Sequence, residues 1–247
     1  MTICPNELFG SRRDKPAVRQ VYGLSGQGKT VMLAEALRSA CRSSSFGAKH
    51  RFVVFDVKHD GYETLAPPNP NVVTAIRQLN REKIAVIHPD IKTAKEELDD
   101  LIDFLFDASD YDPEFSATLI LEESSTFITA HKVPDQIKRL ATQGRSKGLT
   151  LILVNQRALS NRWTDTQSSS ITMFRLAIPD RKMLKERWGL IAEEIDPKLA
   201  KKKFSFAHFD LETLETSFFQ PIAVPKKRTP IVKHRERYTS LFRNPFV

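Results

Sequence analysis

The fold of this protein is predicted from one segment, Gly23-Leu24-Ser25-Gly26-Gln27-Gly28-Lys29-Thr30. It matches the pattern G-x-x-x-x-G-K-[ST] at every fixed position. A short apolar run, Val18–Tyr22, comes before it, and a segment with apolar residues at helical spacing, 30–45, comes after it. A strand, a glycine-rich turn and a helix in this order predict a phosphate-binding loop, or P-loop, rather than a glycine-rich turn that only caps a helix.

The residue types of this loop suit ATP and Mg²⁺. Glycines let backbone N–H groups surround the β-phosphate, and the helix N-terminus adds its dipole. Lys29 is expected to reach the β- and γ-phosphate oxygens, and the Thr30 hydroxyl is expected to ligate Mg²⁺. We assign nucleotide binding to all eight residues of the segment: Gly23, Leu24, Ser25, Gly26, Gln27, Gly28, Lys29 and Thr30.

Two acidic residues, Glu122 and Glu123, end another apolar run at 117–121. Their place fits a Walker B site, in which the first acid holds the magnesium shell and the second polarises the attacking water. Glu122 is therefore a candidate metal-site residue, and Glu123 is a candidate catalytic residue. The first acid of such a pair is usually Asp, and the longer Glu122 shifts the geometry without removing the role. The alternative is a pair of surface charges at a strand end.

Further apolar runs alternate with helical segments, which predicts an α/β fold with a mostly parallel sheet flanked by helices and a small C-terminal extension. The expected strands are 18–22, 52–57, 83–88, 117–121, 149–154 and 171–178, and the expected helices are 30–45, 72–79, 93–107 and 135–142. A charged helical region at 181–203 and an alternating aromatic segment at 204–209 follow.

Two strands between the P-loop and Glu122 indicate the additional-strand, RecA-like branch of P-loop NTPases. In this branch, 149–154 inserts between the P-loop strand and the Walker B strand. Its C-terminal end would place the amide of Gln156 beside the γ-phosphate, where an amide can orient water; Asn155 is the competing candidate.

Composition excludes several classes of protein. The chain has 247 residues, of which 40% are hydrophobic and 28% are charged, so disordered and fibrous classes do not fit. The longest apolar runs are far shorter than the ~18–20 residues of a membrane span, and no signal peptide is recognised. Cys4 and Cys41 lack the spacing of a disulfide framework or a zinc site, which favours a reducing, intracellular compartment.

We divide the chain into an irregular lead-in (1–16), a P-loop ATPase domain (17–220) and a basic tail (221–247). The net charge of the chain is +8, and the tail holds seven basic residues and one acidic residue. Such a tail attracts phosphate backbones by releasing counterions, although a charge run is also typical of a solvated terminus.

The segment 144–157, GRSKGLTLILVNQR, resembles the "G-R-x-x-G, hydrophobic strand, Q-R" block of the FtsK/HerA family of DNA-pumping ATPases. The P-loop, Glu122-Glu123 and Phe55-Asp56-Val57-Lys58 extend this resemblance over about 18–178. The small size is most similar to the genome-packaging ATPases of tailless, internal-membrane-containing viruses and phages.

The resemblance implies a homo-oligomeric ring, a hexamer in this family, that hydrolyses ATP and moves double-stranded DNA into a preformed capsid. It further implies contacts with capsid or viral membrane proteins at a packaging vertex, and a location in the host cytoplasm or the virion. By this analogy Arg145 is a catalytic finger that reaches the neighbour's γ-phosphate. Arg157 is the rival finger, and an Arg145 that merely favours a helix end is the other alternative.

Other functions and roles stay open on the sequence. The alternatives are a phage assembly or export ATPase, a P-loop kinase or nucleotide switch, and a nucleic-acid-binding protein with a relic ATP site. No winged-helix DNA-reading domain is recognised. Arg162, Trp163 and the polar residues up to Ser170 fit either a surface loop or a pore lining, and Phe204, Phe206 and Phe209 fit either packing or base stacking.

Overall fold

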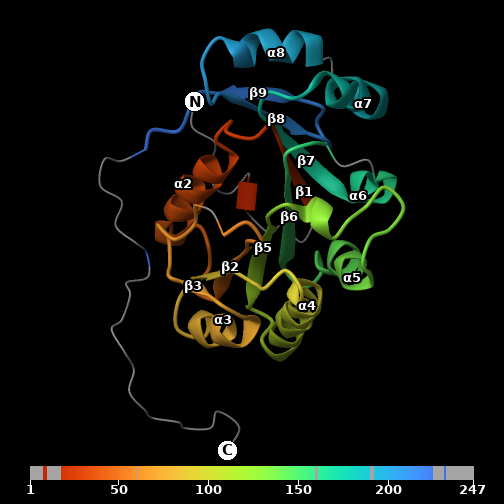
Figure 1. Ribbon diagram of the computed structural model, residues 1–247. Helices are drawn as coiled ribbons and strands as arrows, with labels where there is room; N and C mark the ends of the chain where they lie inside the picture. Colours follow the sequence, from red (N-terminus) through yellow and green to blue (C-terminus); the bar gives the residue numbers. More distant parts are fainter. Residues whose placement is uncertain are drawn as a thin grey trace, which may run out of the picture.

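The structure is a computed structural model that describes residues 8–9, 18–59, 61–158, 161–189, 192–224 and 231. Nine strands of these residues form one sheet, in the order β3-β4-β2-β5-β6-β1-β7-β8-β9 (Figure 1). The strands are β1 (Val18–Tyr22), β2 (His50–Phe55), β3 (Pro68–Asn69), β4 (Ile84–Ile87), β5 (Ser116–Leu121), β6 (Leu149–Asn155), β7 (Ser168–Met173), β8 (Phe206–Asp210) and β9 (Thr216–Phe219). Pairing is parallel from β3 to β7 and antiparallel for β8 and β9.

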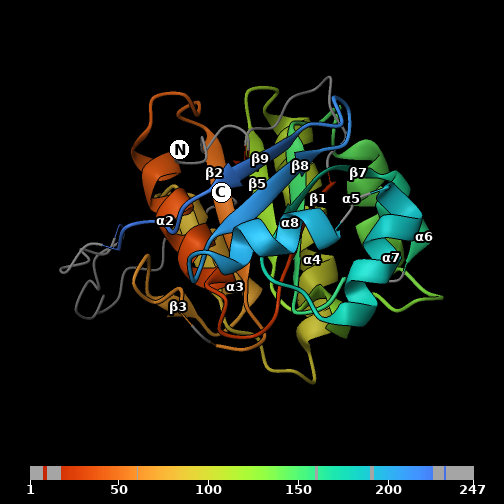
Figure 2. The same cartoon turned by 90° about the horizontal axis from the view of Figure 1, so that it is seen from above.

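Helices cover both faces of this sheet. They are α2 (Lys29–Arg42), α3 (Val72–Leu79), α4 (Ala94–Tyr111), α5 (Asp135–Gln143), α6 (Arg162–Thr166), α7 (Ile178–Trp188) and α8 (Ala192–Ala200). Seen from above, α2 lies on one side of the strands, and α5, α6 and α7 lie on the other (Figure 2). Two hydrophobic clusters follow this division, one with the apolar side chains of α2 and one with those of α3, α4 and α5. The predicted α/β class with a mostly parallel, helix-flanked sheet is confirmed.

Strand β6 lies between β5 and β1, which confirms the inserted strand of the additional-strand arrangement. It pairs in parallel with both neighbours, with Leu119 opposite Leu151 on one side and Val21 opposite Val154 on the other. All seven residues of β6 are buried, as a strand covered on both faces requires. The ends of β1, β5 and β6 therefore meet at one edge of the sheet, the carboxyl edge.

The region after β7 differs from the expectation. The strand expected at 171–178 is β7, Ser168–Met173, and Ile178 instead begins α7. The charged helical region is two helices, because α7 ends where Gly189 adopts a left-handed φ of 64°. Strands β3 and β9 and the short helix α6, which Asn161 caps by accepting hydrogen bonds from two backbone N–H groups, were not predicted.

Two residues of the N-terminal segment, Leu8 and Phe9, are helical and fully buried. Phe9 packs edge-on against Phe52 at 5.8 Å between ring centroids, and its carbonyl accepts a hydrogen bond from the Thr118 hydroxyl. The rest of the predicted lead-in, and the predicted tail apart from 221–224 and 231, lie outside the described residues. Within the described part of the chain, no helix combines the length and the apolar character needed to cross a membrane.

Candidate active site

The P-loop joins the carboxyl end of β1 to the N-terminus of α2. Its first residues are fixed by the chain after β7, because Leu24 N–H donates to the Arg175 carbonyl at 3.0 Å. A Cβ at Gly23 would lie 2.6 Å from Cβ of Phe174, so no larger residue fits there. Gly28 caps α2 with a left-handed φ of 93°. The loop thus joins a buried strand to a helix N-terminus through glycines with positive φ, the type of backbone from which N–H groups can bind a phosphate.

Lys29 is buried inside this loop and bonds to it. Its Nζ donates to the carbonyl of Gly23 at 2.6 Å and to that of Leu24 at 3.2 Å. Burial lowers the pKa of Lys29, and the nearby carboxylates of Glu122 and Glu123 oppose that shift. The ammonium group is therefore held at the loop and close to both acids, where a phosphate oxygen can replace a carbonyl as its partner.

Glu122 ends β5 and is almost fully buried. Its carboxylate accepts a hydrogen bond from the hydroxyl of Tyr62. Burial raises the pKa of Glu122 to about 7, with smaller contributions in the same direction from Asp56 and Glu123. Burial disfavours the charged form of such a carboxylate, and a cation beside it stabilises that form. Together with the Thr30 hydroxyl, it supplies the oxygen donors that Mg²⁺ takes alongside nucleotide phosphates.

The segment after β2 connects Thr30 to Glu122. A Cβ at Gly61 would lie 2.7 Å from the methyl carbon of Thr30, and the next residue, Tyr62, is fully buried and bonds to Glu122. Tyr62 was not predicted as a site residue. It follows an irregular polar segment, and a single tyrosine outside a motif gives no sequence signal of this role.

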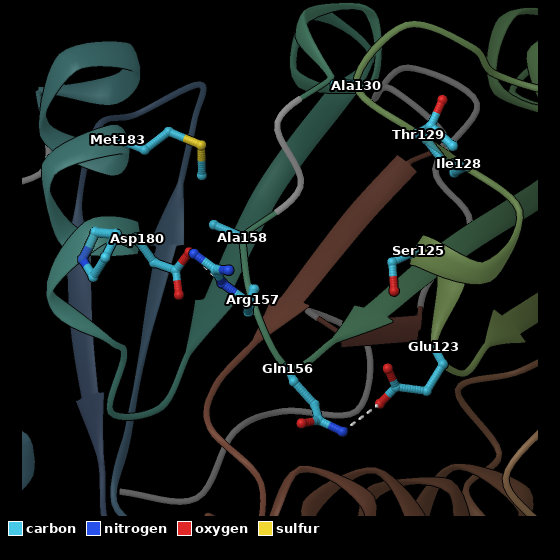
Figure 3. A pocket seen from close by; sticks show the side chains of 11 residues that line it. Glu123, Ser125, Ile128, Thr129, Ala130, Gln156, Arg157, Ala158, Asp180 and Met183 are labelled. Carbon is cyan, nitrogen blue, oxygen red and sulfur yellow. Dashed lines mark hydrogen bonds and ion pairs between the residues drawn. The ribbon is translucent and has the colours of Figure 1, made fainter.

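Glu123 has an unusual backbone and two side-chain partners. Its φ of 48° and ψ of 49° are left-handed, a conformation that non-glycine residues adopt rarely and that gathers at functional sites. Lys58 forms an ion pair with Glu123. Figure 3 shows the second partner, Gln156, whose Nε2 donates to the Glu123 carboxylate at 3.3 Å. Glu123 follows β5 and Gln156 follows β6, so the structure brings these two predicted site residues into contact.

Asn155, the competitor of Gln156, is buried and fully used within the protein. Its Nδ2 donates to the Ser124 hydroxyl at 2.6 Å, and its Oδ1 accepts from Ser125 N–H at 2.8 Å. These bonds tie β6 to the turn that follows Glu123. Asn155 thus holds the turn, and Gln156 is the amide that faces Glu123.

A pocket of about 560 Å³ opens beside Glu123 and Gln156 (Figure 3). Arg157 and Asp180 lie in its wall, and the guanidinium of Arg157 contacts the buried carboxylate of Asp180 at 3.4 Å. The Arg157 side chain is 69% exposed. It lies at the same edge of the sheet as the P-loop, so it can act within its own subunit.

Arg145 lies elsewhere. It is exposed in the turn between α5 and β6, before the first residue of β6. The P-loop follows the last residue of β1, which runs parallel to β6. A strand of seven residues at about 3.3 Å each therefore separates Arg145 from the phosphate-binding edge, about 20 Å. The structure does not bring Arg145 together with the other site residues of its own chain.

The remaining candidates divide into packed and exposed side chains. Trp163 is partly buried against the hydrophobic core, which fits packing. Phe206 and Phe209 are buried in β8, whereas Phe204 is exposed and contacts the P-loop at Gly28.

No protein-family model matches the sequence, and no curated protein matches it significantly. Solved structures do match. The genome-packaging NTPase B204 of Sulfolobus turreted icosahedral virus 2, in complex with ATP-gammaS, has a TM-score of 0.63 at 17% identity, over 85% of this chain and 100% of that chain. The DNA-packaging ATPase B204 of Sulfolobus Turreted Icosahedral Virus has a TM-score of 0.66 at 18% identity, over 86% and 100%.

A third similar structure is the cytoplasmic domain of the Type VII secretion ATPase EccC of Thermomonospora curvata. Its TM-score is 0.57 at 18% identity, over 85% of this chain and 26% of that chain. At these identities the likeness concerns the fold. The sheet order, the P-loop and the similar structures agree that this chain has the fold of P-loop NTPases of this kind.

Proposed function

We propose that this protein is an ATPase that moves double-stranded DNA and packages a viral genome into a capsid. The observation that carries the ATPase part is Glu123, which Lys58 and Gln156 hold at the same sheet edge as a complete P-loop. The DNA part is supported by the block at 144–157 and by the fold it shares with B204, whose name describes a genome-packaging NTPase.

Binding uses the P-loop and its neighbours. Backbone N–H groups of the loop receive the phosphates, and Lys29 exchanges its carbonyl partners for β- and γ-phosphate oxygens. Thr30 and Glu122 are the residues that would hold Mg²⁺, which supplies charge neutralisation between the β- and γ-phosphates. Tyr62 donates a hydrogen bond to one oxygen of the Glu122 carboxylate, which restricts the orientation of that group.

Hydrolysis uses Glu123 and Gln156. The carboxylate of Glu123 accepts a proton from a water molecule as the water oxygen bonds to the γ-phosphorus, and the bond from that phosphorus to the bridging oxygen breaks. ADP leaves with the bridging oxygen, and phosphate forms from the γ-phosphoryl group and the water. Gln156 orients the water, and Lys58 compensates the charge of Glu123 before the nucleotide arrives.

The experiment is steady-state ATP hydrolysis at low salt, with and without linear double-stranded DNA. We expect DNA to stimulate the wild type strongly and Lys29→Ala to give only the blank rate. Glu123→Gln should still bind ATP while kcat falls by about 10²–10⁴-fold, the usual contribution of a positioned base. Wild-type turnover in Glu123→Gln would remove Glu123 from the proposed role.

A protein-export motor is the second candidate, because EccC, named as a secretion ATPase, has a similar fold. The same assay separates the two functions. Hydrolysis that depends on Lys29 and is not stimulated by DNA would assign this chain to assembly or export. A separate result, transfer of phosphate to a nucleoside acceptor without release of inorganic phosphate, would assign it to the kinases.

A further inference from the structure

Exposed apolar side chains gather around the P-loop. The described residues contain nine large hydrophobic side chains that are exposed, and three of them lie at this loop: Leu24, Val31 and Phe204. Leu24 belongs to the loop itself, and Val31 is in the first turn of α2. Their exposed fractions are 38%, 38% and 42%. Phosphate binding needs none of these apolar surfaces.

Phe204 reaches the loop from a distant part of the sequence. A Cβ at Gly28 would lie 3.2 Å from Cδ1 of Phe204, so the ring packs directly over that glycine. Phe204 also has a left-handed φ of 69°, which only specific surroundings sustain in an aromatic residue. The ammonium of Lys203, itself exposed, lies 4.9 Å from the centre of the ring.

The sheet order indicates the direction in which a nucleotide extends from the loop. The hydrolytic side chains, Glu123 and Gln156, follow β5 and β6 on one side of β1. A γ-phosphate placed at these residues leaves the nucleoside to extend toward the other side of β1, where β7 and β8 lie. Phe204 stands two residues before β8, on that side.

We propose that Phe204 is the stacking platform for the base of the nucleotide. The proposal rests on nucleotide binding by the P-loop, as proposed above. Aromatic rings and nucleobases attract each other through their faces, and the exposed Lys203 can release the ring as a base arrives. The exposed lysines Lys201, Lys202 and Lys203 give the approach a positive potential.

This role predicts a specific pattern of affinities. Stacking uses the π-face that all bases share, so Phe204 strengthens binding of adenine and guanine nucleotides alike. Inorganic tripolyphosphate has no base and is held by the P-loop alone. Replacing Phe204 should therefore weaken nucleotides and leave tripolyphosphate unchanged.

The experiment is calorimetric titration of the full chain with ADP, GDP and tripolyphosphate, each with Mg²⁺. We expect Phe204→Ala to raise the dissociation constants of ADP and GDP by about 5- to 100-fold and to leave that of tripolyphosphate unchanged. Phe204→Trp should restore nucleotide binding. Leu214→Ala is the matched control, because Leu214 is also an exposed hydrophobic residue with a positive φ, but lies in the β8–β9 turn.

Three outcomes would overturn the proposal: equal weakening of ADP and tripolyphosphate in Phe204→Ala, an unchanged ADP affinity, or a loss of ADP binding in Leu214→Ala of the same size. Failure of the proposed function gives a different result. In that case the wild type binds neither ADP nor tripolyphosphate, or Lys29→Ala binds tripolyphosphate as the wild type does.

Discussion

Glu122 and Glu123 are adjacent in the sequence and have different surroundings. Glu122 is buried, and Tyr62 donates to it, whereas Glu123 is held by Lys58 and Gln156 beside an open pocket. Two carboxylates whose environments differ in this way can divide the work of cation binding and proton transfer. The turn in the backbone at Glu123 separates the two side chains.

Tyr62→Phe tests the role given to the buried hydroxyl. The hydrogen bond from Tyr62 lowers the pKa of Glu122, so its removal should raise that pKa above the present value of about 7. A hydrogen bond to a charged group contributes about 1.5–3 kcal/mol, which corresponds to a shift of about 1–2 pH units. The acidic limb of the pH profile of kcat/KM, which reports the groups of the free enzyme, should therefore move to higher pH by that amount.

Tyr111→Phe serves as the control, because Tyr111 is 92% exposed at the end of α4. A profile that does not move in Tyr62→Phe would show that the hydroxyl leaves the ionisation of Glu122 unaffected.

For single residues, local motifs were easier to predict from the sequence than hydrogen-bond partners. The P-loop and the Glu122-Glu123 pair are local patterns, and each lies at the expected edge of the sheet. The sequence does not decide which of Asn155 and Gln156 lies beside Glu123, because both follow the same apolar run. The structure distinguishes them, because the turn after Glu123 binds the amide of Asn155. Tyr62 was not predicted, because it belongs to no motif and its hydrogen bond to Glu122 joins segments that are far apart in the sequence.

Among the elements, the buried parallel strands were the most predictable. Strands β1, β5 and β6 were expected within a residue of their observed bounds, since continuous apolar runs between polar ends leave few alternatives. The expected strand at 171–178 was too long. Phe174 is apolar like the strand residues before it, but the chain turns there so that Phe174 packs on Gly23 of the P-loop.

His50 makes the stability of the β2–β5 pair depend on pH. Its ring nitrogens bond to the hydroxyls of Ser116 and Thr118 at 2.7 and 3.1 Å, and burial lowers its pKa to about 3. Between the unfolded value of about 6.5 and this folded value, only the unfolded chain binds the proton. The contribution of His50 to stability is thus present above pH 6.5 and is lost as the pH falls toward 3.

The measurement is the free energy of unfolding as a function of pH for the wild type and His50→Asn. The variant should lack up to about 1.4 kcal/mol per pH unit of the wild-type dependence below pH 6.5. The exposed His131, changed to Gln, is the control. Identical slopes in all three proteins would contradict a buried neutral His50.

At the scale of the whole molecule, the place of Arg145 has a consequence for assembly. It lies about 20 Å from the phosphate-binding edge of its own sheet, so the proposed contact with a γ-phosphate requires a neighbouring subunit. A head-to-tail interface joins unlike edges of two copies in this way, and it forms a ring where the rotation from copy to copy closes. The domain limit predicted at 16/17 and most of the predicted basic tail lie outside the described residues, and the limit predicted at 220/221, just after β9, stays a prediction.

Mixed subunits test this arrangement. Arg145→Ala and Glu123→Gln should each be inactive alone, and an equal mixture should regain activity at about one interface in four, where an intact Glu123 meets an intact neighbouring Arg145. ATP hydrolysis across a series of mixing ratios measures this. The same series with Arg157→Ala tests the rival finger, and a mixture that stays inactive at every ratio would leave Arg145 with a structural role.

ATP-driven movement along DNA tests the proposed translocation most directly. A linear duplex that carries a short triplex-forming third strand reports it, because a motor that travels along the duplex displaces the third strand. We expect displacement by the wild type with ATP, and none by Glu123→Gln, which still binds ATP. Hydrolysis that DNA stimulates without any displacement of the third strand would contradict translocation and leave a DNA-dependent nucleotide switch.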